Sequence, residues 1–182
     1  MIQYIFAWGS SLSLVGTGLL VAFRIVYNRV SARNPVWVDP VMFPDPLLLE
    51  PIDSREDYFR VLDHYRVKSG VRGNAWVEPG FDTDFLSIPW FARAYLSPNS
   101  RYRRAAVQHD RDYWFQDVRR GVADRAFREE MESLDSRVAH VRRWDRAVLR
   151  SARWLIFHAL RAGGWWAWRG NGRARRREES GQ

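Results

Sequence analysis

The segment Gln108 to Phe127 (QHDRDYWFQDVRRGVADRAF) constrains the fold most strongly, because its spacing predicts two short helices joined by a break. His109 and Tyr113 lie four residues apart, so they share one face of a helix expected over Arg101 to Phe115. The break falls around Asp117 to Gly121, where a glycine favours the end of a helix. The first half of this segment therefore presents a histidine and a tyrosine on one side.

A second amphipathic helix is predicted after the break. Its inner residues recur at spacings of three and four: Asp124, Phe127, Met131 and Leu134. His109 and Asp124 lie at comparable distances on either side of the break, so in an antiparallel hairpin they come level. Asp124 would then orient the His109 imidazole, as a general base requires. The alternative is that the two side chains hold the hairpin together through a buried hydrogen bond without catalysis.

A transmembrane helix is predicted near the N-terminus, because the twenty residues Tyr4 to Phe23 carry no charge and match the thickness of a bilayer. Arginines follow this run and none precedes it, which predicts a cytoplasmic C-terminal domain. A cleaved signal peptide is the alternative, but the segment lacks a basic start. Small residues four apart in the span permit self-association, although such residues also fill single spans without that role. Residues 1–30 are thus expected to form a single-pass anchor.

The anchor is followed by a proline-rich connector over 31–57 and then by short strands. Tyr58 to Val77 is expected to form a small antiparallel sheet, with a turn at Gly70 to Gly73. After the sheet, Asp82 and Asp84 stand in an oxygen-rich loop of the kind that calcium binds. Taken alone, the loop is better explained by acidic side chains that cap a turn through local hydrogen bonds.

The C-terminal part contains a basic amphipathic helix over Val138 to Arg161, expected to end at Gly163 and Gly164. Tryptophans follow it: Trp165, Trp166 and Trp168. They fit either insertion at a membrane interface or closure of the core, since tryptophan is frequent in both settings. Residues 169–182 are expected to form a basic, disordered tail.

The chain has a formal net charge of +8, ten tryptophans and no cysteine. The positive charge favours phosphate-bearing partners, and the tryptophans favour a lipid membrane over nucleic acid. The lack of cysteine excludes disulfides, thiolate metal sites and cysteine nucleophiles.

Four blocks of the sequence, GFDTDFLSIP, AAVQHDRDYW, VADRAFREEM and GGWWAW, resemble in the same order those of a phage-borne family, domain of unknown function 1353. The resemblance covers about residues 58–168. It implies a bacteriophage or prophage product and assigns no activity.

A more distant resemblance concerns the helix pair of the phospholipase A type two superfamily, especially the disulfide-free domain of parvovirus capsid proteins. It implies that His109 activates water and that Asp110 binds calcium. It also implies that Asp124 orients His109 with help from Tyr113. The glycine-rich calcium loop of that superfamily has no counterpart here, so only the Asp82 to Ser87 loop, through Asp82 or Asp84, would complete the metal site.

The expected fold is α+β, with an N-terminal transmembrane helix, a small antiparallel sheet, a helical hairpin and a long C-terminal amphipathic helix. The leading hypothesis is a membrane-anchored phage protein with a phospholipase-like, calcium-dependent site that hydrolyses lipid. The competing hypothesis is a non-catalytic virion, assembly or lysis component that binds membrane and other phage proteins. Nucleic-acid binding by the arginine-rich C-terminus ranks below both.

Overall fold

The computed structural model describes Leu19 and residues 21–33, 47–54, 58–85, 101–138 and 141–180 of the 182-residue chain. The strands are β1 (Leu49–Pro51), β2 (Phe59–Val61), β3 (Tyr65–Ser69), β4 (Gly73–Val77) and β5 (Asp82–Thr83). The helices are α3 (Arg103–Phe115), α4 (Arg120–Ser136) and α5 (Arg143–Ser180), besides the helical residues 21–33. The predicted α+β class and the helical hairpin of α3 and α4 agree with this order.

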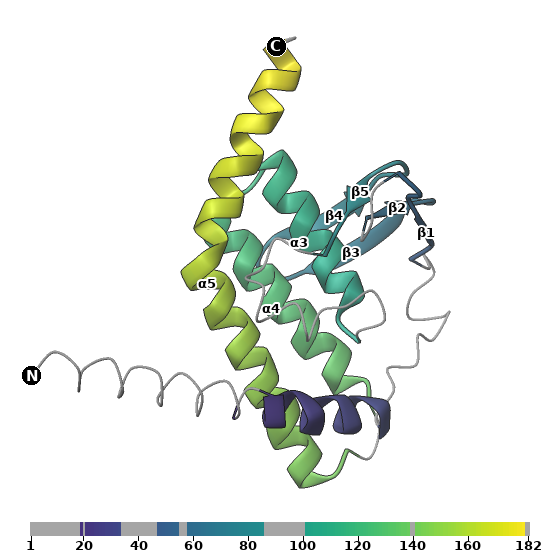
Figure 1. The fold of residues 1–182 in the computed structure, drawn as a ribbon, viewed down its shortest axis with the longest axis vertical. Coiled ribbons are helices and arrows are strands. Elements are labelled where there is room, and N and C mark those ends of the chain that lie inside the picture. The colour runs from purple at the N-terminus through teal and green to yellow at the C-terminus, as the bar shows by residue number, and fades with distance from the viewer. Residues whose placement is uncertain are drawn as a thin grey trace, which may run out of the picture.

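The strands form two small antiparallel sheets that lie beside α3 (Figure 1). One sheet has the order β1-β2-β5, and the other is the β3-β4 hairpin. In the hairpin Tyr65 pairs with Val77, and both side chains are fully buried against the helices. The turn between the strands ends at Gly73, whose φ of 85° favours glycine.

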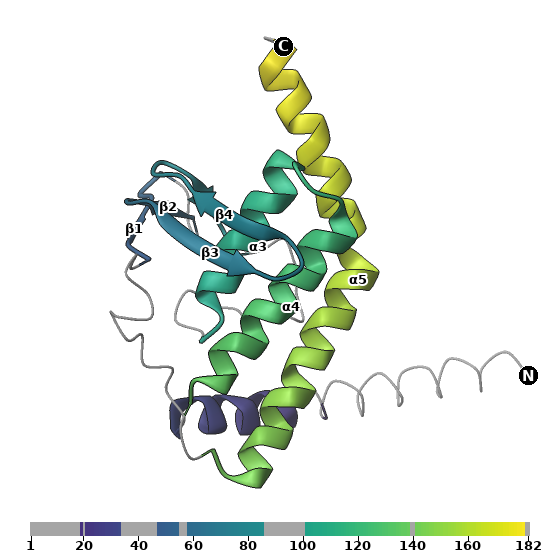
Figure 2. The ribbon, with the colours of Figure 1, turned by 180° about the vertical axis from the view of Figure 1, so that it is seen from behind.

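The three long helices pack side by side, with α5 running along both α3 and α4 (Figures 1 and 2). The core between them is built from apolar side chains at helical spacing in each helix. Its largest fully buried members include Tyr102, Tyr113, Phe127, Met131, Leu134, Leu149, Ile156 and Leu160. The apolar residues that recur at helical spacing in the sequence are therefore the residues that pack between the helices.

Helix α5 is one element of 38 residues, long enough to extend past the end of the other helices (Figure 1). The predicted helix end at Gly163 and Gly164 is wrong, because both residues lie inside α5. Gly164 is buried against Tyr113, so the glycine permits close packing instead of ending the helix. Residues 169–180, predicted as a disordered tail, continue the same helix.

The predicted transmembrane helix is also wrong. Residues 4–18 of the proposed span lie outside the described residues, and no helix within the described ranges is long and apolar enough to cross a membrane. Residues 21–33 form a helix that crosses the helical layer where α4 ends and α5 begins (Figures 1 and 2). Tyr27 and Val30 are buried in the core, and Arg33 Nη2 lies 3.1 Å from Asp145 Oδ1. Uncharged length alone does not establish a membrane span.

Candidate functional site

The structure brings His109, Asp124 and Tyr113 together between α3 and α4. His109 Nε2 lies 3.1 Å from Asp124 Oδ1. The Tyr113 hydroxyl donates a hydrogen bond of 2.7 Å to the same oxygen, and Arg161 of α5 donates one of 2.8 Å to Asp124 Oδ2. Both oxygens of the carboxylate are therefore engaged, and the orientation of Asp124 is fixed from three sides.

The reversal between α3 and α4 sets this geometry. Gln116 adopts a left-handed conformation with φ of 53°, and its N–H bonds the Asp112 carbonyl at 3.0 Å, which closes α3. Gly121, predicted as the stop, lies instead in the first turn of α4. An α-helix was expected to end at a glycine, but here a glutamine takes the left-handed position.

Burial and hydrogen bonding determine the charges in the site. Burial of Asp124 opposes its ionisation, but hydrogen bonds from His109, Tyr113 and Arg161 outweigh burial and lower the pKa of the carboxyl group. Burial, together with the neighbouring Asp124 carboxylate, raises the pKa of Tyr113, so its hydroxyl remains a neutral donor. Because an ionised carboxylate only accepts, Nε2 of His109 carries the proton, and a neutral imidazole then holds its lone pair on Nδ1.

The His109 ring is packed between two aromatic side chains. Its centroid lies 4.0 Å from the Tyr113 ring and 5.1 Å from the Phe127 ring. Only 3% of the His109 surface is exposed. The imidazole is thus held rigidly and is almost closed to solvent in this conformation.

An acidic cavity of about 660 Å³ lies on the sheet side of α3. Four carboxylates line it: Glu78, Asp82, Asp84 and Asp110. Aromatic side chains of α3 and two residues of α5 also line it: Trp114, Phe115, Ala167 and Asn171. Asp110 directly follows His109 in α3, but the residues that line this cavity do not include His109, Tyr113 or Phe127.

Strained backbone positions the loop after β5 against Asp110. Phe85 is buried and has a φ of 55°, which is rare for a bulky residue. Its N–H bonds the Thr83 hydroxyl at 3.2 Å, and that hydroxyl donates a hydrogen bond of 2.6 Å to Asp110 Oδ2. The strain at Phe85 therefore accompanies the docking of this loop onto α3, close to the acidic cavity.

The predicted metal ligands share the cavity without forming a metal centre. Asp82 is held by Arg60, whose Nε donates to Asp82 Oδ1 at 2.8 Å. Asp110 accepts the Thr83 hydrogen bond described above. Among the residues that the structure describes, no group of three or more histidine and acidic side chains is arranged to hold a metal ion.

The three predicted interface tryptophans have different surroundings on α5. Trp168 is half-buried and meets the Tyr113 ring edge-on, with centroids 5.1 Å apart. Trp166 is 72% exposed, and Trp165 lies beneath the guanidinium group of Arg169. Trp168 thus helps to close the site, whereas Trp166 is a surface residue.

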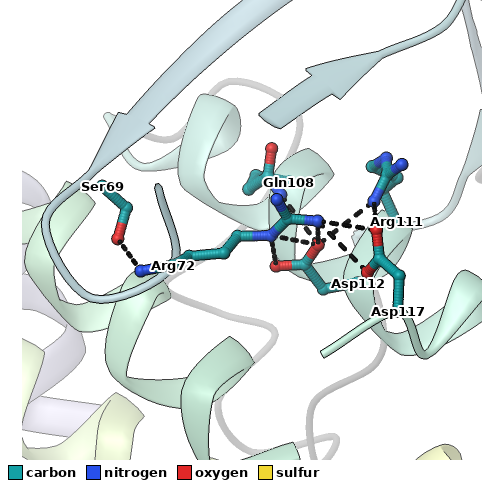
Figure 3. A network of polar contacts seen from close by, with 6 residues as sticks. All are labelled: Ser69, Arg72, Gln108, Arg111, Asp112 and Asp117. Atoms are coloured by element: carbon teal, nitrogen blue, oxygen red, sulfur yellow. Dashed lines mark hydrogen bonds and ion pairs between the residues drawn. The ribbon is translucent and has the colours of Figure 1, made fainter. Parts of the chain in front are cut away.

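A second polar network, which the sequence analysis missed, joins the β3-β4 turn to α3 (Figure 3). Arg72 Nε lies within 2.8 Å of both oxygens of Asp112, which is fully buried. Gln108 Nε2 donates a further bond of 2.9 Å to Asp112, and Asp117 accepts bonds from Arg72 and Arg111. The network fixes the hairpin turn to the helix that carries His109.

The same turn is attached to α4 by Glu129. Its carboxylate accepts hydrogen bonds from the Ser69 hydroxyl at 2.6 Å and from the N–H groups of Gly70 and Val71 at 2.8 and 3.2 Å. For the Arg72–Asp112 network, the sequence signal is the arginine between two turn glycines in SGVRG, together with the acidic pair in HDRD. Neither pattern specifies a partner, so only the folded chain reveals the contacts.

Comparison with known proteins gives one match. Residues 59–147 match the model of a family described as "Protein of unknown function (DUF1353)". The GGWWAW block lies beyond the matched range. No curated protein and no solved structure matches the chain, so the likeness to phospholipase A type two gains no support. The match supports membership of the DUF1353 family for the segment from β2 to the start of α5.

Proposed function

We propose that this domain hydrolyses lipid esters, with His109 as the general base. The observation that carries the proposal is the Asp124 carboxylate, which is held by Tyr113 and Arg161 and bonded to His109 Nε2. This arrangement fixes one tautomer of the imidazole and leaves Nδ1 as the proton acceptor. The acidic cavity next to Asp110 is large enough for part of an ester substrate.

The proposed reaction uses water as the nucleophile. His109 Nδ1 removes a proton from water while the water oxygen bonds to the acyl carbon. The ester bond to the leaving oxygen then breaks, and the imidazolium returns the proton to that oxygen, which gives a carboxylic acid and an alcohol. Asp124 stays ionised throughout and stabilises the transient imidazolium, since its pKa is already lowered.

Calcium is proposed only as an activator. Asp84 and Asp110, which line the acidic cavity, would hold it together with water, while Asp82 forms an ion pair with Arg60. The described residues do not form a complete cation site, and no step of the proposed reaction depends on the cation.

The experiment measures fatty-acid release from phospholipid vesicles with calcium and with a chelator. We expect release by the wild type and its loss in His109→Ala, because no other group at the site replaces the base. His158→Ala is the matched control, since His158 lies exposed on α5 and contacts Trp154. Equal release from wild type and His109→Ala, or no release from the wild type, would refute the proposal.

A second candidate function is a non-catalytic phage component, in the virion or in assembly or lysis, that binds membrane surfaces and other phage proteins. Two observations favour it: the His109 ring is almost closed to solvent, and Trp144, Trp154 and Trp166 are each more than 60% exposed on α5. Exposed tryptophans on a basic helix suit the lipid headgroup region. For this function we expect His109→Ala to lower stability while vesicle binding remains, and Trp154→Ala with Trp166→Ala to weaken that binding.

A further inference from the structure

A second cavity, of about 530 Å³, lies where the C-terminus of α3 and the N-terminus of α4 face α5. Its lining is formed by Gln116, Arg120, Trp165, Trp168, Arg169, Gly172, Arg173 and Arg176. None of these residues lines the acidic cavity, although both cavities contact the same stretch of α5. The two sites therefore have opposite charge on neighbouring faces of one helix.

The lining is strongly basic. It contains four arginines and, among the described lining residues, no aspartate or glutamate. Arg169, Arg173 and Arg176 follow one another at spacings of four and three, so they project from one face of α5. Among the residues whose side chains the structure describes, which exclude Glu178 and Glu179, Arg173 and Arg176 have no ion-pair partner. Four like charges around one concavity attract an anion and repel each other without one.

The N-terminus of α4 adds to the positive electrostatic potential at the cavity. Arg120 is the first residue of α4, and its N-cap Arg119 makes no side-chain capping bond. The first turn of α4 contains no acidic residue. The partial positive charge of the helix end is therefore not balanced locally, which favours an anion at the cavity.

Aromatic side chains form the wall of the cavity next to the arginines. The Arg169 guanidinium lies 4.2 Å from the centroid of the Trp165 ring, which holds its planar group in place. Gln116 Nε2 donates a hydrogen bond to the Trp168 carbonyl, so the α3 terminus is attached to α5 at this point. The cavity thus has a fixed rim, and guanidinium groups present the paired donors that phosphate oxygens accept.

We propose that this cavity binds a phosphate-bearing anion, either the headgroup of an anionic lipid or a soluble phosphate compound. Arg173 and Arg176 supply the main ionic contacts, while Arg120 and the first turn of α4 complete the site. The inference rests on the cavity and its charges, and it holds whether or not His109 is a catalytic base.

The test measures binding of inorganic pyrophosphate by calorimetry at fixed ionic strength. We expect saturable binding at one site, weakened about tenfold or more in the double variant Arg173→Gln/Arg176→Gln, because each charge-assisted hydrogen bond contributes that much. The matched control is Arg29→Gln/Arg103→Gln, which removes the same charge from exposed positions on other helices. Both pairs are exposed on the helix surface, so folding is expected to be retained.

A second arm distinguishes the two sources of phosphate. Sedimentation with phosphatidylcholine vesicles, with and without phosphatidic acid, measures headgroup binding. Binding that requires phosphatidic acid, is lost in the cavity variant and is competed by pyrophosphate identifies a lipid headgroup. Pyrophosphate binding without vesicle binding identifies a soluble phosphate compound. Equal weakening in both variant pairs, or no pyrophosphate binding by the wild type, would overturn the proposal.

Discussion

Gly164 lies so close to Tyr113 that a Cβ atom on residue 164 would fall 2.6 Å from the Tyr113 hydroxyl oxygen. Glycine inside a helix costs about 1 kcal/mol relative to alanine. Here its small size leaves room for the hydroxyl that bonds Asp124. The contact therefore connects a backbone position of α5 to the geometry around His109.

Gly164→Ala is expected to lower the free energy of unfolding by about 1–3 kcal/mol, because the added methyl group overpacks the core at Tyr113. The control is Gly170→Ala in the same helix, where no atom lies within 4 Å of the added Cβ. That change should stabilise the protein by up to about 1 kcal/mol through helix propensity. Urea denaturation of both variants checks the pair, and effects of the same sign would contradict the packing argument.

Asp124→Asn is expected to lower the free energy of unfolding at pH 7 by about 2–4 kcal/mol, since three donors lose a charged acceptor. The folded pKa of Asp124 lies below its ordinary value of 3.8, so its contribution is present above that value. The contribution is lost as the pH falls through the folded pKa.

Urea denaturation between pH 7 and pH 3 measures this difference. The gap between wild type and Asp124→Asn should narrow on acidification. Asp117 and Glu129 also have lowered pKa values, but they remain in both proteins and cancel in the comparison. A gap that stays constant down to pH 3 would mean that the Asp124 charge does not stabilise the fold.

Arg72→Gln is expected to lower the free energy of unfolding by about 3–5 kcal/mol, because the fully buried Asp112 carboxylate loses its closest ionic partner and keeps only the 3.5 Å ionic contact with Arg111. Arg60→Gln removes a similar ion pair with Asp82, but that arginine is half exposed and its charge is screened by water, so we expect a much smaller loss of stability. Thermal or chemical denaturation of the two variants provides the comparison. Similar losses would show that burial does not decide the strength of these pairs.

Glu129→Gln is expected to speed amide hydrogen exchange at Gly70 and Val71 by roughly tenfold, since both N–H groups lose a charged acceptor. Exchange in the core of α3 should not change. Glu132→Gln is the control, because Glu132 pairs only with Arg128 on the surface of α4. Equal amide exchange rates at Gly70 and Val71 in the two variants would contradict the proposed role of Glu129.

The sequence predicts best where contacts follow local spacing. His109 and Tyr113 share a helix face by their separation of four, and the hairpin brings Asp124 level with them. The Arg72–Asp112 pair joins residues forty positions apart, and no local pattern specifies such a partner. A pair of glycines is compatible with either a helix end or a close packing contact. The sequence therefore predicts a helix end at Gly164, where α5 in fact continues.

The N-terminal prediction failed for a related reason. An uncharged run can match the thickness of a bilayer, but its length alone is not sufficient evidence for a span. Tyr27 is buried against Tyr102, with ring centroids 6.5 Å apart, and hydropathy does not predict such a tertiary contact.

Helix α5 begins at Arg143, only a few residues before the family match ends at position 147. The residues of α5 that contact Asp124 and Tyr113 therefore lie outside the matched segment: Arg161, Gly164 and Trp168. A fragment that stops at the family boundary would expose the inner face of the α3-α4 hairpin to water. In this chain, α5 therefore covers a face that the matched segment alone leaves open.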